Sequence, residues 1–268
     1  MKLVILGSGV CASQLPGIPN RFPPGFLVEW ESERVLFDCS EGIRFRLEQA
    51  GYDYAAIEHV AVTHPHPDHY AFPYFYQSMC CTGWWGGAKS RGVTLYGPDQ
   101  LTEDFPVLWK MLTPENDGKF FDLMKVHLRG MSSGKEVAEI GSGKLLAQPV
   151  YHGFGKTPAV SYRLETPEGI FAYSGDTGEC EGVREVAHGA DIFVCEASSR
   201  VGDDETSKEY GHLSPYLAGK IALEGGVKKL ILVHYTGLDS DDAIALDTRR
   251  SGFVGDLVIG KDFMEFNS

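Results

Sequence analysis

Seven residues, Thr63–His69, constrain this chain more than any other part of its sequence, because they hold three histidines, an aspartate and two prolines. Residues 60–62 are apolar and favour a strand that leads into this histidine run. His64 and His66 each precede a proline, which pushes their backbone into the extended region. Side chains two residues apart on an extended segment point the same way, so these two imidazoles converge. Asp68 follows where the chain can turn into a helix, and the run predicts a metal site rather than a polar surface turn.

The overall composition is that of an ordinary globular protein of 268 residues, with 43% hydrophobic and 23% charged residues. No stretch approaches the roughly 20 apolar residues of a membrane span, and the apolar run at residues 3–6 is too short for a signal peptide. The six cysteines form no C-x-x-C pair and mostly lie beside apolar runs, which suits a reducing compartment. We therefore expect one domain over residues 1–268, in the cytoplasm.

The formal net charge of −13 narrows the range of partners. Proteins that bind nucleic acid through many phosphates usually present a basic face, and this chain has no basic run longer than a pair. Bound metal ions would reverse the sign of the charge locally. The charge therefore disfavours nucleic acid as a partner and leaves it as an alternative.

Strands and helices are predicted along the whole chain, and both halves have the same order, mostly strands with helices attached. Two such halves suggest two mixed sheets packed face to face with helices outside. This is a four-layer αββα sandwich of the α/β class, although composition alone does not select it. The predicted strands are residues 2–6, 26–30, 34–38, 59–63, 93–96, 123–128, 136–140, 144–150, 159–164, 170–173, 192–195, 229–233, 257–259 and 263–266, and the predicted helices are residues 41–50, 99–112, 181–187, 214–224 and 241–251.

The stretch after the histidine run is unusually aromatic, with five aromatic residues between positions 70 and 76 and a tryptophan pair at 84–85. Aromatic residues this dense belong most often to a core or an interface. The alternative is that they line a substrate pocket beside the metal site. The sequence leaves both interpretations open.

Three further residues are candidate partners of the histidine run. His152, Asp176 and His234 each come shortly after one of the apolar strands predicted above. Loops at strand ends are where functional groups cluster. Taken singly, each residue also has an ordinary interpretation, as a hydrogen-bonded surface histidine or as a turn aspartate. Their shared placement favours a common site.

The spacing His64-x-His66-x-Asp68-His69 resembles the signature of the metallo-β-lactamase superfamily. The rest of the pattern is similar to its phosphodiesterase branch, which contains ribonuclease Z, and the similarity extends from residue 3 to about residue 236. The matching segments are Leu36-Phe37-Asp38-Cys39-Ser40-Glu41-Gly42, His152, Ser174-Gly175-Asp176-Thr177, Glu196-Ala197, His212-Leu213-Ser214 and His234.

The resemblance implies an αββα sandwich with two divalent metal ions, usually zinc, in a cleft at one edge. Imidazole and carboxylate ligands also suit manganese or iron. Asp38 or Glu41 would fix a histidine tautomer from outside the ligand set, unless they cap a helix. Homologues are often dimers, so a homodimer is expected. The implied ligands are His64, His66 and His152 for the first metal, Asp68, His69 and His234 for the second, and Asp176 for both.

The same resemblance implies a hydrolase that cleaves a small phosphodiester through a hydroxide bound between the two metals. Asp68 would orient that hydroxide, and His212, held by Glu196, would protonate the leaving oxygen. His212 has the alternative role of a helix N-terminal residue before Ser214, and Glu196 that of a strand-end carboxylate whose hydrogen bonds are satisfied. Two divalent metals, two carboxylates and a hydroxide leave one net positive charge. That charge matches a phosphodiester or a sulfate monoester better than a neutral lactone or thioester.

One departure from ribonuclease Z bears on the substrate. Only 24 positions separate His152 from Asp176, the interval in which ribonuclease Z carries the long arm that holds the body of a tRNA. Because there is no room for that arm, we expect a small anionic phosphodiester as the substrate in place of tRNA.

Three alternative functions stay open at this point. One is a ribonuclease Z-type tRNA 3′-end endonuclease that works without the arm. Another is an arylsulfatase, lactone hydrolase or thioester hydrolase that uses the same metals. The third is a metal-binding protein of cofactor biosynthesis without catalysis. The pair formed by His212 and Glu196 argues against the third, because a protein that only binds metal needs no leaving-group acid.

Overall fold

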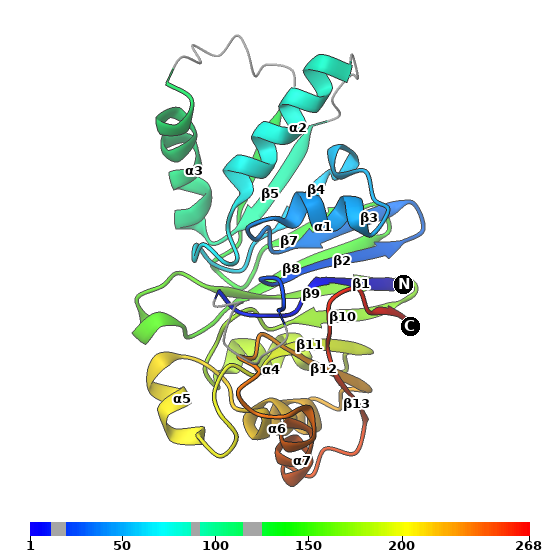
Figure 1. Ribbon diagram of the computed structural model, residues 1–268, viewed down its shortest axis with the longest axis vertical. Coiled ribbons are helices and arrows are strands. Elements are labelled where there is room, and N and C mark those ends of the chain that lie inside the picture. The colour runs from blue at the N-terminus through cyan, green and yellow to red at the C-terminus, as the bar shows by residue number, and fades with distance from the viewer. Residues whose placement is uncertain (12–19, 87–91, 115–124) are drawn as a thin grey trace.

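Two seven-stranded sheets form the centre of the computed structural model, which describes residues 1–11, 20–86, 92–114 and 125–268 (Figure 1). The first sheet consists, in spatial order, of β14 (Glu265–Asn267), β1 (Lys2–Gly7), β2 (Gly25–Trp30), β3 (Glu33–Phe37), β4 (His59–Ala61), β5 (Val93–Gly97) and β6 (Val126–Gly130). The second consists of β13 (Asp256–Ile259), β12 (Lys229–Val233), β11 (Ile192–Glu196), β10 (Gly169–Tyr173), β9 (Val160–Thr166), β8 (Gly143–Pro149) and β7 (Val137–Ile140).

Each sheet combines antiparallel hairpins with parallel strands. In the first sheet β1, β2 and β3 are antiparallel, and β4, β5 and β6 follow β3 in parallel. In the second sheet β7 to β10 are antiparallel, and β11, β12 and β13 follow β10 in parallel. Strand β14 returns from the end of the chain and pairs with β1. Both sheets are therefore mixed, as the sequence predicted.

Helices cover the outer faces of the two sheets (Figure 1). Parallel neighbouring strands need long crossover connections, and helices supply most of these. Together the helices and sheets make the four layers of an αββα sandwich, so this prediction is confirmed. The first sheet is covered by α1 (Ile43–Gln49), α2 (Phe72–Gly86) and α3 (Asp99–Leu112), and the second by α4 (Glu181–Ala187), α6 (Pro215–Glu224) and α7 (Asp241–Arg250). Helix α5 (Asp204–Tyr210) lies beside the short helix η2 (Gly153–Gly155). The short helix η1 (Tyr54–Ala56) precedes β4.

Helices α6 and α7 begin where local chemistry favours a helix. The hydroxyls of Ser214 and Ser240 accept hydrogen bonds from backbone amides of the first turn, which contributes about 1 kcal/mol per cap. Pro215 occupies the first position of α6, where its missing amide hydrogen has no cost. Helix α7 has two acidic residues in its first turn and two arginines in its last, which complements the helix dipole.

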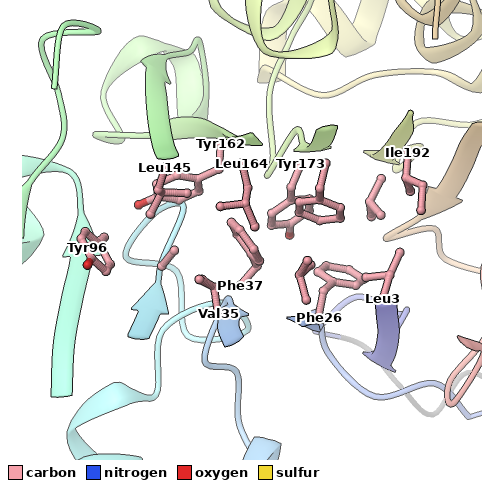
Figure 2. Close-up of a cluster of buried hydrophobic side chains, with 14 of the residues drawn as sticks. Leu3, Phe26, Val35, Phe37, Tyr96, Leu145, Tyr162, Leu164, Tyr173 and Ile192 are labelled. Atoms are coloured by element: carbon pink, nitrogen blue, oxygen red, sulfur yellow. The ribbon is translucent and has the colours of Figure 1, made fainter. Parts of the chain in front are cut away.

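An apolar layer between the two sheets holds them together (Figure 2). The ring of Phe26 lies 4.8 Å from that of Tyr173, and the ring of Phe37 lies 4.9 Å from that of Phe171, measured between centroids. All four side chains are buried. Burying one such side chain contributes roughly 1.5–3 kcal/mol, so the contact between the sheets is a main source of stability.

The aromatic stretch after the histidine run forms α2, a helix that was not predicted from the sequence. Phe72, Phe75 and Tyr76 are buried on the outer face of the first sheet, whereas Tyr74 is 63% exposed. The interpretation of this stretch as core is confirmed for the three buried rings. Tyr70 instead lines a surface cavity of about 390 Å³ beside the histidine run.

Other differences from the predicted elements are small. The predicted helix 41–50 begins at Ile43, the short helix α5 was not predicted, and β6 begins at Val126. Residues 123 and 124 of the predicted strand 123–128 lie outside the described residues. Among the helices of the described part of the chain, none combines the length and apolar character needed to cross a bilayer.

Candidate metal centre

Loops that follow strands of both sheets meet at one edge of the sandwich. The histidine run follows β4, and His152, Asp176 and His234 follow β8, β10 and β12. The amide of Val160 donates a hydrogen bond to the carbonyl of Thr63 (3.0 Å), which joins the two sheets beside the run. The structure brings together all seven side chains that the sequence proposed as metal ligands.

The histidine run folds back on itself directly after β4. The amides of His69 and Tyr70 both donate to the carbonyl of His66 (2.9 and 2.8 Å), which closes a turn. This turn brings the ring of His69 to 4.2 Å from the ring of His64, and the ring of His66 lies 4.6 Å from that of His64. Helix α2 begins after the turn, at Phe72. The predicted turn is therefore present, and it gathers the three imidazoles.

His64, His66 and His152 form the first of two ligand groups. Their donor atoms all lie within 4.8 Å of one another, and His152 Nε2 is 3.2 Å from His66 Nδ1. Burial lowers the pKa of His66 below the usual 6.5 and that of His64 well below it, so both rings are neutral at neutral pH. Neutral imidazole nitrogens that face one another are suited to a divalent cation.

Asp68, His69 and His234 form the second ligand group. His69 Nε2 lies 3.2 Å from His234 Nε2, and Asp68 Oδ2 lies 3.5 Å from His234 Nε2. Burial opposes protonation of His69, but the carboxylates of Asp176 and Asp38 raise its pKa to about 9. The second group therefore attracts positive charge.

Asp176 lies between the two groups, with one carboxylate oxygen toward each. Its Oδ1 is 3.4 Å from both His69 Nε2 and His234 Nδ1. Its Oδ2 is 3.9 Å from His64 Nε2 and 4.0 Å from His152 Nε2. Burial disfavours its charge, but the surrounding imidazoles hold the pKa of Asp176 well below its usual range.

Two buried atoms of the site lack a hydrogen-bond partner, namely Asp176 Oδ1 and His64 Nε2. Leaving a buried polar atom without a partner costs roughly 1–3 kcal/mol. A metal ion would satisfy both atoms, because a carboxylate oxygen and a neutral imidazole nitrogen are its usual ligands. The residues present therefore fit divalent metal ions.

Four of the imidazoles are fixed through Nδ1 by a group outside the cluster. Such a contact sets the tautomer and the orientation of a ligating histidine. Of these partners only Asp38 was predicted from the sequence, because a hydroxyl or a backbone carbonyl carries no distinctive sequence signal. The pairs are His64 with Thr63 Oγ1 (3.0 Å), His69 with Asp38 Oδ2 (2.7 Å), His152 with the carbonyl of Gly211 (2.9 Å) and His234 with Ser198 Oγ (2.6 Å).

Asp38 makes several hydrogen bonds to residues of the site. Its carboxylate accepts from the amide of Thr63 (2.7 Å), from the hydroxyl of the same residue (3.0 Å) and from the hydroxyl of Tyr173 (2.6 Å). Its φ of 56° is in the left-handed region, which costs roughly 1–3 kcal/mol for a residue other than glycine. These hydrogen bonds offset that cost. Glu41 is exposed, so Asp38 is the partner that the structure provides for His69.

His212 and Glu196 form a further pair at the edge of the cluster. His212 Nδ1 lies 3.0 and 3.1 Å from the two carboxylate oxygens of Glu196 and 4.0 Å from Asp176 Oδ2. Glu196 is buried at the end of β11 and also accepts a hydrogen bond from the amide of Thr177 (2.7 Å). Burial opposes protonation of His212, but the Glu196 carboxylate raises its pKa to about 10.

The side chain of His212 does not cap the helix that follows it. Ser214 has that role, since its hydroxyl accepts a hydrogen bond from the first turn of α6. The ring of His212 instead lies 5.0 Å from the ring of His152 and 6.2 Å from that of His234. Because 27% of its side chain is exposed, His212 remains accessible to a molecule bound at the cluster.

Residues 33–235 match the model of the beta-lactamase superfamily domain, a range that contains every residue of the cluster. The chain belongs to this superfamily, and it is a metallo-hydrolase with the metallo-β-lactamase fold.

Proteins similar to this chain indicate its branch within the superfamily. A ribonuclease Z of Streptomyces avermitilis is 28% identical over 295 residues, which cover 98% of this chain and 96% of the relative. The metallo-beta-lactamase fold protein YhfI from Bacillus subtilis covers 100% of this chain and 99% of its own, with a TM-score of 0.79 and 20% identity. Human tRNase Z, short form (ELAC1), has a TM-score of 0.75 at 19% identity and covers 100% of this chain and 99% of its own.

A diphosphatase from the PhnP family has a TM-score of 0.71 at 20% identity and covers 100% of this chain and 96% of its own. These likenesses confirm the predicted resemblance to the ribonuclease Z-like branch of the superfamily.

Proposed function

We propose that this chain is a phosphodiesterase that cleaves a small phosphodiester at a centre of two divalent metal ions. The observation that carries this proposal is the placement of Asp176 between two imidazole groups, with His212 4.0 Å away. A protein that only held metal would need the ligand groups alone. The additional pair of His212 with buried Glu196 provides a proton for a leaving group.

The donor atoms of the site support divalent metal ions. Imidazoles and carboxylates without thiolate suit zinc best, and also manganese or iron. Two such ions would lower the pKa of a bound water and neutralise charge on a phosphate group. We assign His64, His66 and His152 to the first ion, Asp68, His69 and His234 to the second, and Asp176 to both.

His212 is the residue that we propose as the general acid. Its Nδ1 is bonded to Glu196, so its Nε2 is the atom that delivers a proton to the leaving oxygen. The raised pKa of about 10 keeps this proton in place at neutral pH, against the effect of burial. Asp68, whose Oδ2 lies 3.5 Å from His234 Nε2, is the carboxylate that we propose to orient the attacking water.

Several observations support a small diester over tRNA. The chain has a net charge of −13 and only 24 positions between His152 and Asp176. The alignment with the Streptomyces avermitilis ribonuclease Z runs over 295 residues, more than the 268 of this chain, so that relative has segments without a counterpart here. The similarity to a protein described as a diphosphatase also favours phosphorus chemistry.

Cleavage of tRNA 3′ ends is the second candidate function. The observation that favours it is the similarity to ribonuclease Z over 98% of this chain. Hydrolysis of a sulfate, lactone or thioester at the same metals, and metal binding without catalysis, stay alternatives that the same experiment addresses.

Metal analysis combined with a substrate panel tests this proposal. The panel consists of bis(p-nitrophenyl) phosphate, p-nitrophenyl sulfate, a lactone and a precursor tRNA. We expect about two metal ions per chain and preferred turnover of the phosphodiester. Preferred cleavage of the precursor tRNA would support the second candidate, and less than one ion per chain would overturn the dinuclear centre.

The variant His212→Ala tests the general acid separately. Turnover should fall by about 100-fold or more, because a positioned acid contributes at least that much. Its metal content should equal that of the wild type, since His212 is outside the proposed ligand set. His188→Ala, at an exposed histidine, is the matched control and should leave turnover unchanged. Full activity in His212→Ala would remove this residue from the mechanism.

We also propose that the chain forms the homodimer that its resemblance to the superfamily implies. The molar mass in solution, measured by light scattering, tests this proposal. A monomer at micromolar concentration would contradict it.

A further inference from the structure

The loop after β8 carries three successive residues with left-handed backbone. The φ angles of Gly153, Phe154 and Gly155 are 54°, 59° and 70°. Glycine adopts this region readily, whereas a residue with a Cβ does not. Phe154 is therefore held in a conformation that its own side chain disfavours.

Neighbouring residues fix the conformation of this loop. The amide of Gly155 donates to the carbonyl of His152 (2.9 Å), and the amide of Gly178 donates to the carbonyl of Tyr151 (2.8 Å). His152 Nδ1 is bonded to the carbonyl of Gly211 (2.9 Å). A Cβ on Gly155 would lie only 2.9 Å from the ring of Tyr151. The surroundings therefore impose the strained backbone on Phe154.

The side chain of Phe154 contributes little core packing that could offset this backbone strain. It is 52% exposed, and its ring contacts that of Tyr210, itself 48% exposed, at 5.0 Å between centroids with an angle of 66° between the planes. Phe263 provides a comparison, because it also has a left-handed φ of 65°. Its ring, however, packs 3.7 Å from the guanidinium of Arg46, which in turn binds Asp262. Among the described residues, the aromatic partner of Phe154 is the half-exposed ring of Tyr210.

The position of this aromatic pair links it to the proposed chemistry. Phe154 is two residues after His152, and Tyr210 is two residues before His212. The rings of His152 and His212 are 5.0 Å apart, and the contact of His152 with Gly211 joins the two loops. Helix α5, which ends at Tyr210, lies beside this loop. The two loops that carry this pair therefore also carry His152 and His212, the residue that would protonate the leaving oxygen.

We propose that Phe154 and Tyr210 form a stacking site for the nucleobase of a nucleotide substrate, on its leaving-group side. This inference rests on the proposed phosphodiesterase function. Exposed aromatic rings bind bases by stacking, and edge-to-face pairing of the two rings leaves faces open for it. Nucleotides are the common biological phosphodiesters that carry a planar aromatic ring. The substrate class is therefore a nucleoside phosphodiester rather than a purely aliphatic one.

Two cyclic phosphodiesters, one with a nucleoside and one with glycerol in its place, test this inference on the metal-loaded enzyme. Adenosine 2′,3′-cyclic phosphate carries a base, and glycerol 1,2-cyclic phosphate has the same five-membered ring without one. We expect KM for the adenosine compound to be about tenfold lower than for the glycerol compound, or lower still. In Phe154→Gly, KM for the adenosine compound should rise about tenfold, while KM for the glycerol compound stays the same.

Phe154→Gly removes the ring and also relieves the backbone strain, so it should fold at least as stably as the wild type. Phe154→Trp keeps an aromatic ring and should retain the preference for the base. Phe45→Ala, at a phenylalanine that is 53% exposed on α1, is the matched control and should behave as the wild type. Calorimetry with the product adenosine 3′-monophosphate gives a second readout, with about tenfold weaker binding expected in Phe154→Gly.

The outcomes separate this inference from the proposed function. Hydrolysis of both cyclic compounds with an unchanged base preference in Phe154→Gly would overturn the stacking site alone. Equal KM values for the two compounds in the wild type would also overturn the stacking site alone. Failure of the wild type to hydrolyse either compound or bis(p-nitrophenyl) phosphate would overturn the phosphodiesterase proposal and the stacking site with it.

Discussion

Asp38 Oδ2 lies 2.7 Å from His69 Nδ1 and also accepts a hydrogen bond from the hydroxyl of Tyr173 (2.6 Å). Tyr173 belongs to the apolar layer between the sheets, where its ring packs against Phe26 (Figure 2). One carboxylate oxygen thus connects the core of the sandwich to the candidate metal centre. Asp38 is therefore held by the core on one side and contacts His69 on the other.

Asp38→Asn should weaken metal binding without unfolding the protein. Asparagine tolerates a left-handed φ, but its amide lacks the charge that orients His69 and increases its basicity. We expect the affinity for zinc to fall about 10- to 100-fold, measured by competition with a chelator. Tyr173→Phe is the matched control, because it removes a different hydrogen bond from the same carboxylate. Its stability should fall by about 1 kcal/mol with little change in zinc affinity. Wild-type zinc affinity in Asp38→Asn would contradict the orienting role.

Glu196→Gln should shift the pH dependence of turnover. Burial opposes protonation of His212, yet Glu196 raises the pKa of His212 to about 10, so the protonated form is present below that value and is lost as the pH rises through it. Bound metal ions would lower the pKa of His212 in the wild type and the variant alike. Removing the Glu196 carboxylate lowers the pKa of His212 further in the variant. The alkaline limb of kcat/KM should therefore move to lower pH by about one unit or more.

A pH profile of kcat/KM for the two proteins measures this shift. Glu185→Gln removes an exposed carboxylate from α4 and should leave the alkaline limb where it is. An alkaline limb at the same pH in Glu196→Gln and the wild type would show that His212 is not the group that titrates.

The sequence predicted the side chains that meet in the cluster better than the groups that orient them. His152, Asp176 and His234 were proposed as ligands because each is a chemically distinctive residue after an apolar strand. Thr63 and Ser198, which contact His64 and His234, were not, because a hydroxyl residue in a loop has many ordinary roles. Which loops meet at the edge of the sandwich depends on contacts between distant strands, and spacing in the sequence does not record these.

Helix α2 was not predicted, although its sequence has the apolar spacing of a helix. Its buried residues recur at the spacing of one helix face, which dense aromatic content obscured. Helix α5 is different, because its seven residues are mostly polar and have no apolar stripe that could predict a helix. The buried residues of α2 are Phe72, Phe75, Tyr76, Met79 and Cys80.

We propose that residues 1–268 fold as one domain, and thermal unfolding tests this. Both sheets contribute to one apolar layer, and β14 at the end of the chain pairs with β1 at its start, so the parts should unfold together. We expect a single transition, and zinc at 100 times the Kd of each of the two proposed sites should raise its midpoint by roughly 10 °C. Calorimetry with and without zinc measures both effects. In Asp176→Ala the rise should be lost. Two separate transitions would contradict the single domain.

Gly211→Ala should impair catalysis far more than Gly189→Ala. Both glycines have left-handed φ angles, 79° and 64°, so alanine is strained by roughly 1–3 kcal/mol at either position. A Cβ at Gly211 would also lie 2.8 Å from the Cα of His152, whereas nothing lies within 4 Å of one at Gly189. Relief of that clash must move His152 or the neighbouring His212, and a displacement of about 1 Å can cost 100-fold in rate.

Thermal unfolding and kcat together separate the two effects in these glycine variants. The melting temperatures should fall in both variants, whereas a large loss of kcat is expected in Gly211→Ala alone. Equal kcat values in the two variants would show that the spacing between the loops of His152 and His212 does not matter for turnover. A loss of bound metal in Gly211→Ala would trace the effect to His152, and full metal content would trace it to His212.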